Sequence, residues 1–237
     1  MNESSYRAMR GLARFNLVRK VVAIIMGSEN NDFEMVEGES SLKSELNSQD
    51  FIEKLKNDGI CFGLELPGTA IESIVEYAKE NFVYADRDEN KGFLVENRKE
   101  AEKALGKEIL VAQYFNVQSK LECINEIAND PLIKNIVRGY LGPKASFVGA
   151  NLWWTFPVNA SEEDKNRHAH LYHRDIDDFK FLKFFFYITN VEENDGGHFF
   201  VKGSMKKSPP KKWSENFKAK RYSDEEISDY YGFDNIL

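Results

Sequence analysis

The stretch from Phe179 to Val191 constrains the fold more than any other part of the sequence, because it is almost continuously apolar. An acidic, glycine-containing turn follows over residues 192–197, and a short apolar segment follows over residues 198–201. A strand, a turn and a second strand in close succession favour an antiparallel sandwich or barrel. Residues 145–157 form another strand candidate with a heavy aromatic load, so we expect a β-rich C-terminal half.

The N-terminal half is predicted to be mainly helical. Apolar residues recur there at helical spacing, and Gly, Pro or Asp residues mark the helix ends. The predicted helices cover residues 48–58, 69–82, 98–105, 121–128 and 131–141, and a last helix opens at residues 223–226. Strands are also predicted over residues 60–66 and 109–115, whereas residues 83–97 are predicted to be irregular.

These elements together predict an α+β protein. A chain of 237 residues is long enough for one domain with a sizeable core, and 13% aromatic residues supply large side chains for it. We expect residues 1–50 to form an N-terminal helix and a polar linker, and residues 51–237 to form the domain.

Charge and cysteine content exclude some classes of function. The net charge of −7 gives no attraction to phosphate backbones, so we expect no nucleic-acid partner. Cys61 and Cys123 share no metal-type spacing, and two cysteines favour a reducing compartment over a disulfide framework. The expected location is therefore cytoplasmic.

A short apolar run from Val21 to Met26 follows a series of Arg and Lys residues. It is too short to cross a bilayer. We predict an amphipathic helix that docks on the domain. A helix lying on an anionic membrane surface is the first alternative, and a cleaved or anchoring signal is the second.

All four histidines of the chain lie between residues 168 and 198: His168, His170, His173 and His198. His173 and Asp175 are two residues apart, which on a strand places both side chains on one face, about 7 Å apart. With a third ligand from a distant strand, such a pair forms the 2-His-1-carboxylate site of non-haem iron oxygenases. The alternative is a His hydrogen-bonded to an Asp in a solvated loop.

The wider sequence around this pair resembles the phytanoyl-CoA dioxygenase family of Fe(II)/2-oxoglutarate oxygenases. The family's pattern has His-x-Asp, an apolar strand, an acidic turn with Gly, and a Gly-Ser phrase, and residues 173–204 follow that order. Residues 151–157, 130–132 and 140–142 are also similar to family segments, and the resemblance covers roughly residues 50–235.

The resemblance implies a double-stranded β-helix, or jelly roll, with flanking N-terminal helices. It implies that His173 and Asp175 bind Fe(II), that 2-oxoglutarate is the co-substrate, and that a small organic substrate is hydroxylated. In the family, later strands carry a distal His ligand and an Arg that binds 2-oxoglutarate. We therefore expect a jelly roll that is C-terminally incomplete as given, either truncated, degenerate, or with another residue as distal ligand.

His198 is the remote candidate for that distal ligand, although the family pattern makes it structural. Lys202-Gly203-Ser204-Met205 replaces the family's Pro-Gly-Ser-His phrase, which does not affect the metal ligands. Weaker candidates for cofactor binding are Asn151, Trp153, Tyr187 and His170. The alternative is core packing for Trp153 and Tyr187, and a position in a polar loop for His170. Lys183 is a minor candidate for the 2-oxoglutarate carboxylate, and the basic residues between 206 and 221 for an anionic substrate.

Two rival functions remain open at this stage. A non-catalytic jelly-roll binding module would keep the fold without the chemistry. A cupin-like metal enzyme would use Asp175 with His170 and His173 and would need no 2-oxoglutarate.

Overall fold

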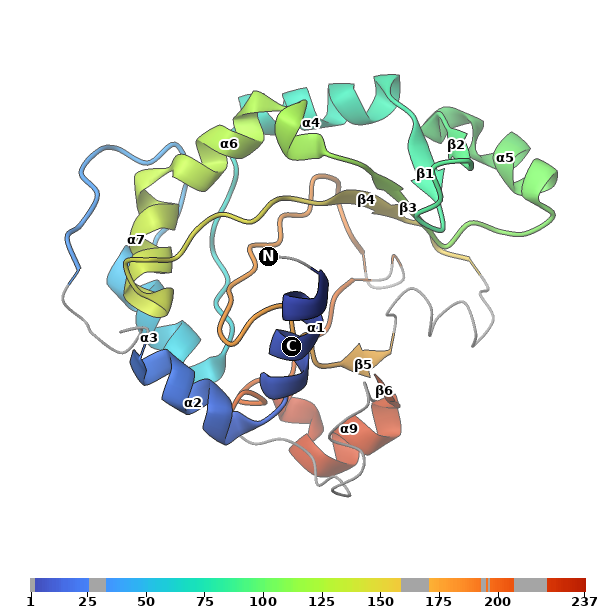
Figure 1. Cartoon of the computed structure of the whole chain (residues 1–237). Helices are drawn as coiled ribbons and strands as arrows, with labels where there is room; N and C mark the ends of the chain where they lie inside the picture. The colour runs from blue at the N-terminus through green and yellow to red at the C-terminus, as the bar shows by residue number, and fades with distance from the viewer. Residues whose placement is uncertain (1–2, 26–32, 159–170, 193–194, 196, 207–220) are drawn as a thin grey trace.

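The computed structural model describes residues 3–25, 33–158, 171–192, 195, 197–206 and 221–237. In these residues the chain is an α+β protein with eight α-helices and a four-stranded antiparallel sheet, which confirms the predicted class. The helices α3, α7, α6 and α4 follow one another along the outside, and the segments after residue 171 run on their inner side (Figure 1).

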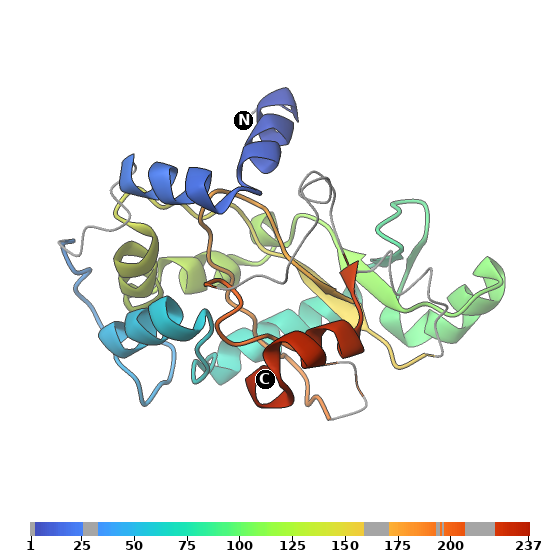
Figure 2. The ribbon, with the colours of Figure 1, turned by 90° about the horizontal axis from the view of Figure 1, so that it is seen from below.

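The N-terminal region contains two helices, α1 (Glu3–Leu12) and α2 (Asn16–Ile25), where the sequence predicted one. Both lie on one side of the molecule, and α1 projects away from the body (Figure 2). The polar segment after them is partly fixed on α7. Val36 exchanges hydrogen bonds with the Asn135 side chain, with N–O distances of 2.8 and 3.1 Å. The predicted domain boundary at residue 50 stays a prediction.

The predicted helices of the middle of the chain are confirmed, and local signals explain their ends. They are α3 (Ser48–Asp58), α4 (Gly68–Glu80), α5 (Arg98–Leu105), α6 (Glu122–Asn129) and α7 (Pro131–Leu141). Asn47 and Asp50 form a capping box at the start of α3. Gly59 (φ 81°) and Gly106 (φ 67°) end α3 and α5 in the left-handed region that favours glycine.

The last predicted helix is also confirmed as α9 (Asp224–Tyr231), with a capping box between Ser223 and Glu226. Three short 3-10 helices complete the helical part of the described chain: η1 (Val95–Asn97), η2 (Val117–Ser119) and η4 (Phe233–Asn235).

The sheet has the order β2-β1-β3-β4, with antiparallel pairing throughout. Its strands are β1 (Val83–Ala85), β2 (Gly92–Phe93), β3 (Val111–Tyr114) and β4 (Leu152–Thr155). One face contributes Val83, Ala85, Ala112 and Tyr114 to a core that also includes Ala78 of α4. The alternate residues therefore point to the other face, where the C-terminal segments lie.

Several predicted strands are wrong. Residues 60–66 form only an isolated bridge, Lys43 to Glu65, and the strand predicted over 145–157 shrinks to β4. Residues 83–97, predicted to be irregular, contain the β1–β2 hairpin. Residues 179–191 and 198–201 form no strand, apart from the isolated bridge between Val201 and Ile236.

The described strands therefore close into no jelly roll. The reason lies in where the apolar side chains of residues 181–189 are buried. Leu182, Phe184, Phe186 and Ile188 pack against the cores formed with α3, α4 and α7. Hydrophobic burial thus fixes this segment against helices, without the ladder of hydrogen bonds that a strand requires.

No helix in the described residues is long and apolar enough to cross a membrane.

Candidate functional site

His173 lies on a two-stranded ribbon formed by β5 (Tyr172–His173) and β6 (Arg221–Tyr222). The strands are antiparallel, with His173 opposite Arg221 and Tyr172 opposite Tyr222. Tyr222 is buried with Val201 and with Ile227 of α9. This small core anchors the ribbon, so the His173 side chain is held by packing on the neighbouring residues.

Hydrogen bonding orients the His173 ring. Its Nδ1 lies 2.9 Å from the Leu171 carbonyl oxygen, and its Nε2 lies 3.2 Å from Asp175 Oδ1. A carbonyl oxygen only accepts, so Nδ1 carries a proton. Asp175 also only accepts, so the protonated ring donates from Nε2 to Asp175, and loss of that proton leaves a lone pair on Nε2 on the side of Asp175. Fixing the tautomer through the other ring nitrogen is the arrangement that metal-binding histidines use.

Asp175 has a second partner, Lys183. Lys183 Nζ lies 2.6 Å from Asp175 Oδ2 and 2.7 Å from Asp177 Oδ2. The hydrogen bonds from His173 and Lys183 outweigh partial burial and hold the pKa of Asp175 well below its usual range. The same hydrogen bond with Asp175 raises the pKa of His173. Asp175 is therefore a carboxylate across the ordinary pH range, and its side chain is still 41% exposed.

The structure brings the two predicted ligands together, and the part of the chain that it describes adds no third one beside them. Within the described ranges, no group of three or more His, Cys, Asp or Glu side chains is arranged to hold a metal ion. His168 and His170 lie outside the described residues. The prediction that His170 faces the site therefore stays a prediction.

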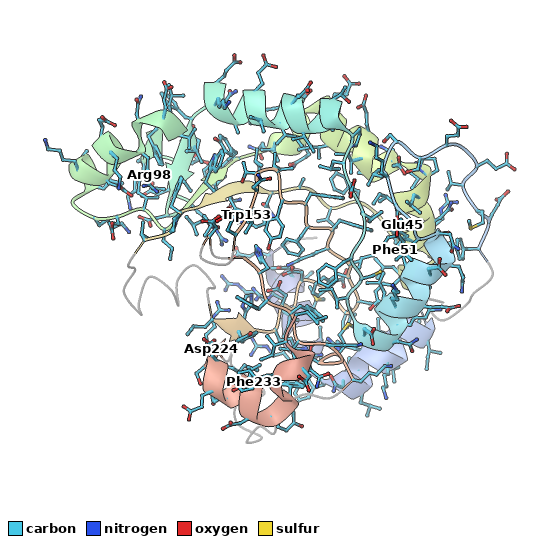
Figure 3. The ribbon with its side chains drawn as sticks, turned by 180° about the vertical axis from the view of Figure 1, so that it is seen from behind. Glu45, Phe51, Arg98, Trp153, Asp224 and Phe233 are labelled. Carbon is cyan, nitrogen blue, oxygen red and sulfur yellow. The ribbon has the colours of Figure 1, made fainter. Side chains whose placement is uncertain are left out.

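A cluster of aromatic rings surrounds His198. The His198 ring lies 6.0 Å from Trp153, 5.1 Å from Phe185 and 6.1 Å from Tyr187, measured between ring centroids. The Tyr187 hydroxyl oxygen accepts from the His198 backbone N–H at 2.7 Å and lies 3.3 Å from Nδ1. Trp153, on β4, is labelled in Figure 3. The structure thus joins two of the predicted cofactor-binding residues through His198.

The His198 cluster lies within electrostatic range of His173. Partial burial lowers the pKa of His198, and the charge of His173 lowers it further. Residues 183–187 connect the His173–Asp175 pair with the His198 cluster, because every second side chain of this segment is exposed on the same face. Lys183 contacts Asp175, whereas Phe185 and Tyr187 contact His198.

One face of residues 183–187 therefore carries both parts of the site, the polar part around Asp175 and the aromatic part around His198. Sequence reasoning gave Asp177 no role and assigned Phe185 to the apolar core, which is wrong because Phe185 is 55% exposed. The period-two alternation of Lys183, Phe185 and Tyr187 with the partly buried Phe184 and Phe186 was the signal that could have identified this face.

Asn151 lies at the edge of this face. Its Oδ1 accepts a hydrogen bond from Gln113 Nε2 at 3.1 Å, and Gln113 is the cross-strand partner of Trp153. Asn151 thereby extends the polar surface of the sheet beside the aromatic part of the site.

None of the family models, curated proteins or solved structures compared with the chain matches it. Fold and site define an α+β protein with a partly exposed His–carboxylate pair beside an aromatic cluster. Its function is inferred from the chemistry of that site.

Proposed function

We propose that this chain is an Fe(II)- and 2-oxoglutarate-dependent dioxygenase that hydroxylates a small organic substrate. The observation that carries the proposal is the contact of 3.2 Å between His173 Nε2 and Asp175 Oδ1, with Nδ1 fixed by Leu171. An imidazole nitrogen and a carboxylate oxygen that lie next to each other are two of the three protein ligands of such a site.

The donor chemistry fits Fe(II). On losing its Nε2 proton to metal binding, His173 offers a neutral nitrogen in the tautomer that Leu171 fixes, and Asp175 offers a carboxylate that stays charged. Fe(II) bound there would let O₂, the oxidant, oxidise 2-oxoglutarate and the substrate together, which is the chemistry that hydroxylation requires. The proposal also requires a third protein ligand, which the described residues do not place beside this pair.

The surrounding residues take supporting roles in this proposal. Lys183 holds the Asp175 carboxylate in place and adds positive charge for an anionic co-substrate. Trp153, Phe185 and Tyr187 form an apolar wall that suits the carbon skeleton of a substrate. Asn151 would contribute a polar contact at its edge.

The jelly roll belongs to the same proposal. The alternating burial of residues 182–189 is the pattern of a strand with one face on a core and one face toward a site. In a complete double-stranded β-helix this segment would pair with neighbouring strands.

The test is a pair of measurements on the full chain. Anaerobically loaded protein is analysed for bound Fe(II), and succinate release from 2-oxoglutarate is followed with Fe(II) and O₂. The proposal predicts bound iron and succinate release, and it predicts that His173→Ala and Asp175→Ala lose both. The absence of iron binding by the unmodified chain would refute it.

Asp177→Asn is the matched control. Asp177 shares Lys183 with Asp175, but the described contacts place Asp175, and not Asp177, against His173. We therefore expect the Asp177→Asn variant to retain iron. Equal loss in the Asp175 and Asp177 variants would instead point to a general electrostatic effect.

A non-catalytic binding module is the second candidate, favoured by one specific observation. Lys183 Nζ lies 2.6 Å from Asp175 Oδ2, so a side chain of the protein itself already neutralises this carboxylate. For this candidate, Lys183→Met lowers stability and Fe(II) addition does not raise the melting temperature. An Fe(II)-dependent rise in the melting temperature favours the enzyme.

A further inference from the structure

The outward face of α2 carries apolar residues that nothing in the described structure covers. Leu17 is 75% exposed, Val21 47%, Ile24 63% and Ile25 77%. Leu17, Val21 and Ile24 follow one another at i, i+4 and i+7, so they form a single stripe along the helix. A stripe of large apolar side chains exposed together marks an interaction surface.

The opposite face of α2 contacts the domain. Val18, Arg19, Val22 and Ala23 are partly buried, and Asn16 Oδ1 accepts a hydrogen bond from Arg174 at 3.2 Å. Burial lowers the pKa of Arg19 to about 10. Since the inner face is already in contact with the domain, the outer stripe faces away from the domain.

The charge around the stripe identifies the partner. Residues 1–25 contain five of the 32 Lys and Arg residues and only one of the 39 Asp and Glu residues, in a chain of net charge −7. Arg7 and Arg10 of α1 and Lys20 of α2 are exposed. The apolar stripe therefore lies within the positive region of an acidic protein. That combination is typical of a helix that lies in the interface of an anionic membrane.

We propose that α2 binds to the surface of an anionic lipid membrane through Leu17, Val21 and Ile24, with Arg10 and Lys20 at the headgroups. The helix has ten residues and is about 15 Å long, half the thickness of a hydrocarbon core, so it lies along the surface. A second copy of the chain is the weaker partner, because pairing α2 with itself would bring two positive regions together. This inference does not depend on the proposed enzymatic activity.

The experiment is flotation of the full chain with lipid vesicles. Two vesicle types are compared, phosphatidylcholine alone and phosphatidylcholine mixed with phosphatidylglycerol. We expect binding to the anionic vesicles, weak binding to the neutral ones, and loss of binding as salt rises. Failure to float with the anionic vesicles at low salt would overturn the proposal.

Two matched pairs of variants locate the surface. Leu17→Glu combined with Ile24→Glu should weaken binding at least about tenfold. Phe82→Glu alters a residue that is 57% exposed, between α4 and β1, and should have no effect. Lys20→Glu should weaken binding, whereas Lys79→Glu on α4 should not. Circular dichroism confirms that each variant is folded.

The oligomeric state separates the lipid surface from the other partner. Light scattering at several protein concentrations should give the same mass for the unmodified chain and the double variant. A dimer that forms with the unmodified chain and is lost in the double variant would assign the stripe to self-association and overturn the proposal.

Discussion

Asp130 connects the N-terminal segment to α7, and its replacement by Ala tests how much that connection stabilises the protein. The carboxylate is 4% exposed and accepts four hydrogen bonds. They come from Leu132 N (2.9 Å), Ser41 N (2.8 Å), Ser41 Oγ (3.1 Å) and Ser40 Oγ (2.7 Å). The first caps α7, and the other three hold residues 40–41 against it.

The expected loss follows from these contacts. Removing a helix N-cap costs about 1 kcal/mol. Loss of the hydrogen bonds from Ser40 and Ser41 to the charged carboxylate adds about 2 kcal/mol to this cost. The figure is modest because both serines are exposed, so in the variant water replaces part of their lost hydrogen bonding. We expect Asp130→Ala to lower the free energy of unfolding by about 3 kcal/mol.

Urea denaturation followed by tryptophan fluorescence measures this loss. With a slope of about 3 kcal/mol per molar urea, the midpoint falls by about 1 M. Asn47→Ala is the control, since Asn47 caps α3 at an exposed position and contacts only its own helix in the described structure. The Asn47→Ala variant should lose about 1 kcal/mol of unfolding free energy. Equal losses in the two variants would contradict the claim that Asp130 holds residues 40–41.

The pH dependence gives a second check on Asp130. Burial alone would raise the pKa of this carboxyl, but the hydrogen bonds from Ser40, Ser41 and Leu132 outweigh it, so the pKa lies below its usual value. A depressed pKa means that the stabilisation is present above the pKa of the unfolded chain, about pH 4. The difference between the unmodified chain and Asp130→Ala should therefore shrink as pH falls below 4. A constant difference into acid would contradict this account.

Two further substitutions test the packing of the helices and the sheet. At Gly139 of α7, an added Cβ would lie 2.2 Å from Ile52 Cδ1 of α3, so Gly139→Ala should destabilise by about 2 kcal/mol. Gly68→Ala, where nothing lies within 4 Å, should leave the melting temperature nearly unchanged. Tyr114→Phe removes the acceptor of the Trp154 indole N–H, 3.1 Å away, and should lower the free energy of unfolding in urea by about 1–2 kcal/mol.

The helices could be predicted from the sequence because their signals are local. Gly59 and Gly106 end helices through their own backbone conformation, and Asp130 caps the helix that Pro131 begins. The β1–β2 hairpin was missed because no glycine or proline marks its turn. Asp86 and Arg87 take positive φ angles of 56° and 59° there, which non-glycine residues rarely do.

The Asp86 turn depends on contacts that are distant in sequence. Asp86 contacts Lys91 at 3.0 Å and Lys107 at 2.9 Å. An ion pair with a residue 21 positions away carries no signal in a local window of sequence. At the site, the spacing of His173 and Asp175 was visible in the sequence, but Lys183 was considered only for the 2-oxoglutarate carboxylate, and its contact with Asp175 was not predicted.

Arg174 connects α2, the proposed membrane-binding helix, with the candidate metal ligands. Arg174 lies between the two candidate ligands, His173 and Asp175, in the sequence. It reaches α2, where Arg174 Nη2 donates to Asn16 Oδ1 at 3.2 Å. The inner face of α2 thus contacts the side chain of the residue between the candidate metal ligands, while its outer stripe faces away. Because Leu17 and Ile24 are exposed and Asn16 makes this contact, the double variant leaves the hydrogen bond in place. A loss of vesicle binding with iron binding unchanged would therefore be an effect of the stripe itself, and not of a displaced metal site.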